Sequence, residues 1–197
     1  MSWLALELYR RGMLKLGKFK LTSGLESPFY IDLRKLYSYP DLARRVAKEL
    51  ASVGEIEKLD GVVGIATAGI ALAAYIAALY GIPMAYVRTE RKEHGTLSLV
   101  EGEVAGKRVA IIDDVATTGG SIERAFRALR EAGAEPVIAL VVVDREQGAK
   151  ERLNRLGLEL RSLVTSRQLF EELYRAGVID EHTLKQVITY IESTRAP

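Results

Sequence analysis

The stretch Val109-Ala-Ile-Ile-Asp-Asp-Val-Ala-Thr-Thr-Gly-Gly-Ser121 predicts a strand, a loop and a helix arranged around a ligand. Its apolar start is typical of a buried parallel strand, with Asp113 and Asp114 at the carboxyl end. A loop of hydroxyl side chains and glycines follows, and residues 122–132 have the periodicity of an amphipathic helix. Free N–H groups at a helix start bind phosphate, and the neighbouring carboxylates suit sugar hydroxyls or a hydrated metal ion. The motif therefore predicts a sugar-phosphate site.

This sequence excludes two common phosphate-binding loops. A Walker loop needs a lysine after its glycines, and a dinucleotide-binding loop needs Gly-x-Gly-x-x-Gly after the first strand; neither pattern is present. An ordinary strand-to-helix turn with a hydrophilic N-cap stays as the simpler interpretation. We favour the ligand site because paired acids come directly before a run of small loop residues.

Apolar and helical segments alternate over most of the chain. The pattern predicts strands at 60–65, 83–87, 108–112, 136–143 and 158–164, and helices at 2–16, 40–59, 70–80, 121–132 and 147–156. This order is typical of an α/β fold with a doubly wound, mainly parallel five-stranded sheet and helices on both faces. We expect residues 1–40 to form an N-terminal helix and hood subdomain, and residues 41–197 to form the α/β core with C-terminal helices.

Local signals mark where several of these helices begin and end. Glycines that should end helices stand at positions 81, 133, 157 and 177. Thr165 and Gln168 have the spacing of a capping box, and Asp180 is a predicted N-cap for the last helix.

Composition excludes several classes of protein. The 197 residues contain no cysteine and two histidines, which excludes disulfides, thiol chemistry and histidine-rich metal sites. The formal net charge of +2 gives no general case for nucleic-acid binding. No apolar stretch approaches the ~20 residues that span a bilayer, and the first residues lack the basic region of a signal peptide. We therefore expect a cytoplasmic protein with no membrane partner.

A second candidate loop, Gly64-Ile-Ala-Thr-Ala-Gly69, follows the strand at 60–65. Small residues and a hydroxyl at a helix start predict another anion cradle, although close packing of the helix on the strand explains the glycines nearly as well. Ligands in such sheets bind where the strand order reverses. We therefore expect strands 60–65 and 108–112 to be neighbours, with the ligand crevice between them.

Two further segments have ordinary explanations when each is taken alone. Residues 88–107 form a connection long enough for a lid, but a run of mixed charge is more often a solvated surface. Residues 17–34 predict a β-hairpin, in which core packing accounts for Phe29 and Tyr30.

Arg145 follows the strand at 136–143, where a guanidinium can form a bidentate pair with a carboxylate ligand. On spacing alone, a surface ion pair with Asp144 or Glu146 is the favoured interpretation.

Together these segments resemble a known family. The motif at 109–121 is similar to the signature of the type I phosphoribosyltransferases, whose substrate is phosphoribosyl pyrophosphate. Three further segments resemble the lid, the hood and the base-binding segment of the orotate phosphoribosyltransferases: Arg88-Thr-Glu-Arg-Lys-Glu-His-Gly95, Gly17–Arg34 and Asp144-Arg145-Glu-Gln-Gly148. Thr22 and Ala68 stand where some members carry lysine.

The resemblance implies a type I phosphoribosyltransferase fold, phosphoribosyl transfer to orotate, and Mg²⁺ as a cofactor held mainly by substrate and water. The implied contacts to phosphoribosyl pyrophosphate are Arg88, Lys92, His94, Asp113, Asp114, Val115, Ala116, Thr117, Thr118, Gly119, Gly120, Ser121 and Ile122. The implied pyrophosphate loop is Ala66, Thr67, Ala68 and Gly69, and the implied orotate contacts are Phe29, Tyr30, Thr118 and Arg145. Lys92 and His94 are the implied catalytic lid residues, with Lys92 acting across a homodimer. Transfer to another base such as a purine, and a non-catalytic sensor of phosphoribosyl pyrophosphate, are the alternatives.

Overall fold

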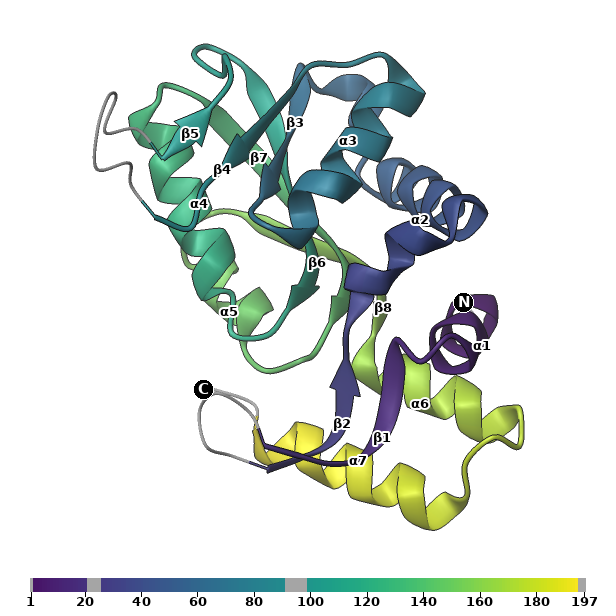
Figure 1. Cartoon of the computed structure of the whole chain (residues 1–197). Helices are drawn as coiled ribbons and strands as arrows, with labels where there is room; N and C mark the ends of the chain where they lie inside the picture. Colours follow the sequence, from purple (N-terminus) through teal and green to yellow (C-terminus); the bar gives the residue numbers. More distant parts are fainter. Residues whose placement is uncertain (1, 21–25, 91–98, 195–197) are drawn as a thin grey trace.

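In residues 2–20, 26–90 and 99–194, which the computed structural model describes, six strands form one central sheet of order β5-β4-β3-β6-β7-β8 (Figure 1). These strands are β3 (Gly61–Ile65), β4 (Met84–Val87), β5 (Val100–Glu101), β6 (Arg108–Ala116), β7 (Glu135–Asp144) and β8 (Glu159–Thr165). Of these described strands, five run parallel and β5 pairs antiparallel with β4 at one edge. The predicted α/β class is confirmed, but the sheet has six strands among the described residues rather than the predicted five. The prediction missed β5 because its two residues are too few to produce a periodic pattern.

Helices cover both faces of this sheet, as the sequence predicted. The helices that follow the sheet strands or precede β3 are α2 (Pro40–Val53), α3 (Ala68–Tyr80), α4 (Gly120–Glu131) and α5 (Ala149–Asn154). Ile112 of β6 is buried in one core cluster with α2 and α3, whereas Ile111 is buried in the other with α4 and α5. Neighbouring residues of a strand point to opposite faces, so β6 is covered on both sides.

The N-terminal residues form a hairpin that packs against the last two helices. The hairpin strands are β1 (Leu14–Lys20) and β2 (Glu26–Ile31), and they follow α1 (Ser2–Arg10). Helices α6 (Ser166–Arg175) and α7 (Glu181–Ser193) contact α1 and β2, respectively. We call β1 and β2 the hood; in Figure 1 the hood lies against α7, below the main sheet. A short 3-10 helix, η1 (Leu33–Ser38), connects the hood to α2.

Three predicted helices are shorter than the sequence pattern indicated, and one of them, predicted at 147–156, is α5 at Ala149–Asn154. The predicted helix 2–16 ends at Arg10, because Gly12 has a φ of +67° and the chain then turns back so that Met13 and Leu14 enter the core. The predicted helix 40–59 ends at Val53 and is followed by η2 (Ile56–Lys58). A Cβ at Gly54 would lie 2.2 Å from Leu140 Cδ1, so the chain passes close to β7 at this point.

The predicted helix ends are confirmed. The glycines with positive φ after helices include the predicted positions 81, 133, 157 and 177. Thr165 and Gln168 form the capping box at the start of α6, and the Asp180 carboxylate accepts a hydrogen bond from the Thr183 N–H at 2.8 Å. Within the described ranges, no helix has the length and apolar character that crossing a membrane requires.

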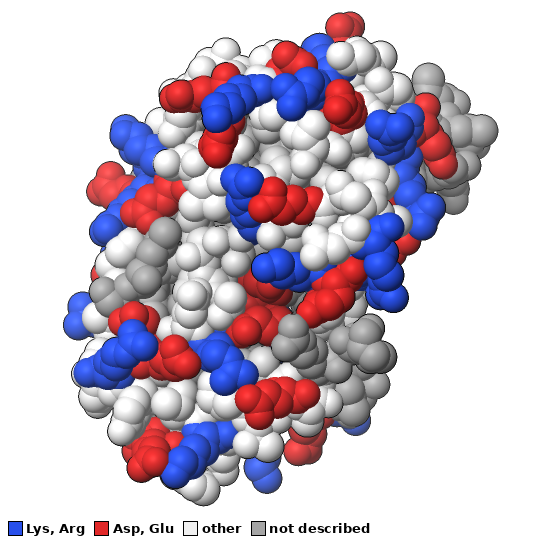
Figure 2. Space-filling model, turned by 180° about the vertical axis from the view of Figure 1, so that it is seen from behind, with Lys and Arg blue, Asp and Glu red and all other residues white. Residues whose placement is uncertain are grey.

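Charged side chains of both signs are mixed on the face of the molecule shown in Figure 2. Among the described residues, ion pairs form within single helices, such as Glu123 with Arg127 in α4 at 2.8 Å and Glu181 with Lys185 in α7 at 2.6 Å. Such exposed pairs contribute about 0–1 kcal/mol each to stability, so the two cores described above carry most of the stabilisation.

Candidate active site

The acid pair lies within strand β6 rather than after it. The ladder between β6 and β7 continues through Asp113, opposite Val141, to Ala116. Asp113 is 8% exposed, and its carboxylate accepts hydrogen bonds from the Asp114 N–H at 3.0 Å and the Ser121 hydroxyl at 3.5 Å. Burial raises the pKa of both acids, and the charge of Asp114 raises the pKa of Asp113 further. Two carboxyl groups held this way favour a ligand that brings hydroxyl donors or positive charge.

The hydroxyl- and glycine-rich loop joins β6 to α4, as predicted. Gly119 has a φ of +78°, and a Cβ there would lie 3.1 Å from Ala149 Cα, so this position needs glycine for both its conformation and its packing. Thr117 and Thr118 are exposed, whereas Ile122 is 1% exposed and anchors the start of α4 in the core. The loop is therefore open to solvent above a fixed helix start.

Two arginines that the sequence did not single out lie beside this loop. A Cβ at Gly120 would lie 3.1 Å from Nη1 of Arg152 and 3.8 Å from Nη1 of Arg124. Glu123 stands in the first turn of α4, where it would repel an anion, but Arg127 at 2.8 Å and Arg152 at 3.7 Å pair with it. Two guanidinium groups thus lie beside Gly120 at the end of the predicted phosphate loop.

The second loop lies beside the acid pair because β3 and β6 are neighbours, which confirms the expected strand order. Helix α3 begins at Ala68, and a Cβ at Gly69 would lie 2.3 Å from the Ile112 carbonyl oxygen and 3.1 Å from Asp113 Cα. The Ala66–Thr67 peptide bond is cis. Close packing therefore explains Gly69, and the same packing brings the helix start against the acid pair.

The segment around η1 lies near the acid pair, and the sequence analysis assigned it no site residue. Arg34 donates to the Asp32 carboxylate at 2.8 and 2.9 Å and to the Tyr30 hydroxyl at 3.4 Å. Tyr37 donates its hydroxyl hydrogen to the Ala68 carbonyl oxygen at 2.7 Å. Burial raises the pKa of Tyr37, and the charges of Asp114 and Asp113 raise it further. The Tyr37–Ala68 contact joins residues 31 positions apart in sequence, and no local pattern signals it.

Arg145 comes directly after β7 and is 7% exposed. Its backbone N–H donates to the Ala116 carbonyl at 2.8 Å, which fixes it beside the end of β6. Burial lowers the pKa of Arg145, but a guanidinium keeps its charge at neutral pH. Its Nε and Nη2 atoms are buried and have no hydrogen-bond partner among the described residues.

The alternative of a surface ion pair for Arg145 is wrong. The Asp144 carboxylate accepts from the backbone N–H of Glu146 at 2.9 Å, and Glu146 accepts from the backbone N–H of Arg167 at 3.0 Å. Neither acid is within ion-pair distance of the Arg145 guanidinium, which lies 4.8 Å from the centre of the Phe29 ring instead.

Phe29 of the hood packs against the Arg145 guanidinium. Phe29 is fully buried, and its ring centre lies 4.9 Å from that of Phe170 in α6 and 5.8 Å from that of Tyr190 in α7. Tyr30 is half-buried, and its ring lies 5.6 Å from that of Phe19. Phe29 therefore contacts the guanidinium with its ring, whereas Tyr30 belongs to the side of β2 that faces Arg34.

Arg88 lies at the carboxyl end of β4, where the predicted lid begins. Its guanidinium is 3.3 Å from the Glu101 carboxylate, and its backbone N–H donates to the Leu99 carbonyl at 2.9 Å. Lys92 and His94, and also Thr22, lie outside the described residues.

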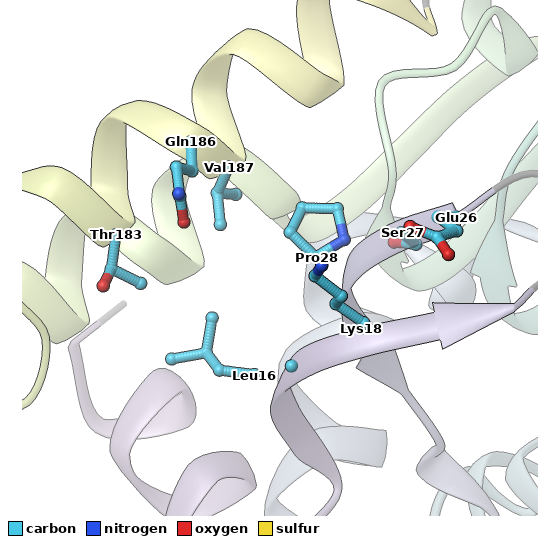
Figure 3. Close-up of a pocket in the computed structure, with 9 residues that line it drawn as sticks. Leu16, Lys18, Glu26, Ser27, Pro28, Thr183, Gln186 and Val187 are labelled. Atoms are coloured by element: carbon cyan, nitrogen blue, oxygen red, sulfur yellow. The ribbon is translucent and has the colours of Figure 1, made fainter.

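A cavity of about 540 Å³ lies between the hood and α7 (Figure 3). Its lining includes Lys18, Pro28 and Gln186, and none of the predicted site residues. The candidate site is therefore identified by its side-chain chemistry and loop geometry rather than by cavity size.

Comparison with known proteins identifies the family. A family model for the phosphoribosyl transferase domain matches residues 34–156, which include both loops, the acid pair and Arg145. A protein of Staphylothermus marinus named orotate phosphoribosyltransferase is 47% identical over 190 residues, covering 95% of this chain and 93% of that protein.

Solved structures give the same result. An orotate phosphoribosyltransferase from Aeropyrum pernix matches with a TM-score of 0.80 and 42% identity, covering 86% of this chain and 97% of that one. The UMP synthase of Leishmania donovani matches with a TM-score of 0.87 and 36% identity; the match covers 98% of this chain and 42% of that longer one.

Proposed function

The chain belongs to the family of orotate phosphoribosyltransferases, and on this basis we propose which of its residues bind and orient the substrates. The reaction transfers the 5-phosphoribosyl group from phosphoribosyl pyrophosphate to orotate and gives orotidine 5′-monophosphate and pyrophosphate. The observation that carries the assignment is the buried guanidinium of Arg145, whose Nε and Nη2 have no partner among the described residues. Arg145 follows β7, the strand that pairs with the strand of the acid pair.

Phosphoribosyl pyrophosphate lies, in this proposal, along the carboxyl ends of β3 and β6. The loop from Thr117 to Ser121 binds the 5-phosphate through its N–H groups and hydroxyls, and Asp113 and Asp114 accept hydrogen bonds from the ribose hydroxyls. The helix start at Ala66–Gly69 binds the pyrophosphate. The support is the contact of Gly69 with the backbone of β6, which brings the two loops to either side of the acid pair.

Orotate binds through its carboxylate to Arg145. A buried guanidinium with two unpaired nitrogens carries a desolvation cost that a bidentate carboxylate removes. A purine has no carboxylate and would leave the charge unpaired, so this observation favours orotate over a purine base. Phe29 holds the guanidinium in place, and Tyr30 and Thr118 contact the base from the hood and from the phosphate loop.

The chemistry places few demands on acid–base catalysis. The bond from ribose C1 to pyrophosphate breaks and its electron pair leaves with the pyrophosphate, while the orotate ring nitrogen, already acidic, supplies the pair for the new bond to C1. The transition state resembles an oxocarbenium ion, and charge accumulates on the leaving group. Positioning and electrostatic stabilisation therefore provide most of the rate enhancement, with Arg88, Lys92 and His94 acting on the pyrophosphate.

The donor set fits Mg²⁺ held mainly by the substrate. Among the described residues no group of three or more metal-ligating side chains is present, and two adjacent carboxylates alone make an incomplete set of oxygen ligands. Asp113 and Asp114 would hold the ion through water or the ribose hydroxyls. When bound, Mg²⁺ supplies charge that neutralises pyrophosphate oxygens.

A homodimer is proposed because α3 has no polar face. Its sequence, Ala-Gly-Ile-Ala-Leu-Ala-Ala-Tyr-Ile-Ala-Ala-Leu-Tyr, contains no charged residue, and Ala74, Ala78 and Leu79 are nevertheless exposed. A helix that is apolar all round is normally covered, and a second copy of the chain would cover it. Helix α3 also contacts β4, and the predicted lid follows β4 in the sequence. In a dimer built on α3, the lid therefore starts near the interface, and Lys92 acts in the partner's site. Leu79→Arg should convert the dimer to a monomer in sedimentation experiments; a dimer that persists would contradict this interface.

Turnover with a panel of bases tests the proposed function. Orotate should be used with Mg²⁺ and phosphoribosyl pyrophosphate, whereas uracil, adenine and hypoxanthine should be poor substrates. Faster turnover of a purine would overturn the assignment of the base. A protein that binds phosphoribosyl pyrophosphate but turns over no base would favour the sensor alternative. A cytoplasmic location remains a prediction from the cysteine-free composition.

A further inference from the structure

We propose that the hydroxyl of Tyr37 is a positioning group that orients the pyrophosphate loop. The proposal rests on the function proposed above and adds a residue from η1, outside both anion-binding loops. Tyr37 does not touch the reacting atoms; it acts through the first residue of α3.

Tyr37 contacts α3 at two points. Its hydroxyl donates to the Ala68 carbonyl oxygen at 2.7 Å, and its ring stacks on Tyr75 with a centre-to-centre distance of 6.1 Å and an interplanar angle of 26°. The first contact is a directional bond to the loop, and the second is packing along the helix. A substitution that removes only the hydroxyl separates the two effects.

The loop depends on its backbone orientation because its side chains are small and uncharged. Ala66, Thr67, Ala68 and Gly69 include no cation, so a bound pyrophosphate would be held by N–H groups at the helix start. The direction of those groups follows the orientation of the peptide planes, and the Ala68 carbonyl belongs to one of these planes. Fixing this carbonyl therefore fixes part of the cradle.

The start of α3 is held by contacts from two different elements. Gly69 packs against the Ile112 carbonyl of β6, where an added Cβ would lie only 2.3 Å away. Tyr37 provides the other contact from η1. The hydroxyl also stays a donor at neutral pH, since burial and the charges of Asp114 and Asp113 raise the pKa of Tyr37. Without this bond the loop would keep its packing and the backbone bond from the Ala66 N–H to the Val87 carbonyl at 2.9 Å, but the Ala68 carbonyl would lose its link to η1.

The test is Tyr37→Phe, with Tyr75→Phe as the matched control. We would measure the dissociation constant of magnesium pyrophosphate by calorimetry, the KM values for phosphoribosyl pyrophosphate and orotate, and the melting temperature. A net hydrogen bond contributes about 0.5–1.5 kcal/mol, so we expect Tyr37→Phe to weaken pyrophosphate binding about three- to tenfold and to raise KM for phosphoribosyl pyrophosphate similarly. KM for orotate should change by less than about twofold, which is less than the loss of one net hydrogen bond produces. Tyr75→Phe should leave all four quantities near those of the wild type.

The outcomes separate this proposal from the proposed function. Unchanged pyrophosphate affinity in Tyr37→Phe would overturn the role of the hydroxyl. Equal losses for orotate and pyrophosphate, or the same losses in Tyr75→Phe, would show a general effect of packing and would also overturn it. A wild type that binds no pyrophosphate would instead overturn the function itself.

Discussion

Replacing Arg145 by methionine should weaken the recognition of orotate without weakening the ligand-free fold. Methionine has a similar length and fills the same buried space beside Phe29 without a charge. The lost contact is a charge-assisted hydrogen bond, which contributes about 1.5–3 kcal/mol. On this basis kcat/KM for orotate should fall roughly ten- to a hundredfold, while KM for phosphoribosyl pyrophosphate stays within about twofold.

The free energy of unfolding of the ligand-free protein should not fall when Arg145 is replaced by methionine. Two guanidinium nitrogens of Arg145 are buried without partners, and an unsatisfied buried donor costs about 1–3 kcal/mol. The guanidinium gains about 0.5–2 kcal/mol from the Phe29 ring. These two effects nearly cancel, so the free energy of unfolding of Arg145→Met should equal or slightly exceed that of the wild type.

The assay compares orotate with uracil, which lacks the carboxylate, in the wild type, in Arg145→Met and in the control Arg167→Met. Arg167 is a nearby arginine whose side chain is 35% exposed and pairs with Glu192 at 3.0 Å. Only Arg145→Met should lose activity with orotate, and uracil turnover should be unaffected in both variants. Equal losses for orotate and uracil, or a loss of more than about 2 kcal/mol in urea unfolding, would refute the reasoning.

Three further predictions concern the acid pair, the lid and the second loop. Asn at both Asp113 and Asp114 should abolish turnover. Burial raises the pKa of both acids above the ordinary 3.8, so their ionisation destabilises the ligand-free fold, and the wild type should lose unfolding free energy as the pH rises from 3.8 through the raised pKa values. Urea unfolding of the double variant should not show this pH-dependent loss. Near-normal kcat/KM in the double variant would contradict the assignment. A mixture of Lys92→Ala with this double variant should regain activity approaching about a quarter of the wild type, because statistical exchange makes half of the dimers heterodimers and each heterodimer has one intact site. No recovery after verified subunit exchange would show that the lid acts in its own subunit. Gly69→Ala should lose about 1–3 kcal/mol in urea unfolding, since its Cβ would meet the Ile112 carbonyl at 2.3 Å, and an unchanged midpoint would contradict the close packing.

Local patterns were sufficient for the sheet and for the two loops. Apolar runs predicted the five parallel strands because a strand covered on both faces has few polar residues. The phosphate loop was predictable because Asp113, Asp114 and the loop residues are contiguous, so the geometry of one strand-to-helix turn brings them together. The helix ends at Gly81 and Thr165 were predictable for the same reason, since caps depend on residues within one turn.

Other features depend on contacts between distant segments. The helix predicted for 2–16 fails at Gly12, where the apolar pattern continues but the chain turns so that Met13 joins the core. The role of Tyr37 depends on its contact with Ala68, and the burial of Arg145 depends on Phe29 and the last two helices. Spacing alone favoured an exposed ion pair for Arg145, because a short-range pattern does not indicate which parts of the chain will cover it.

The packing of the hood on α6 and α7 determines the order in which a newly made chain becomes competent. Phe29 rests on Phe170, about 140 residues later in the chain, and on Tyr190. At about 5–20 residues per second, the ribosome supplies these supports on the order of ten seconds after the hairpin has been made. The strands that carry both anion-binding loops are synthesised within that interval. A nascent chain therefore completes the proposed sugar-phosphate half first, and the proposed pocket for the base forms only after α7 has left the ribosome.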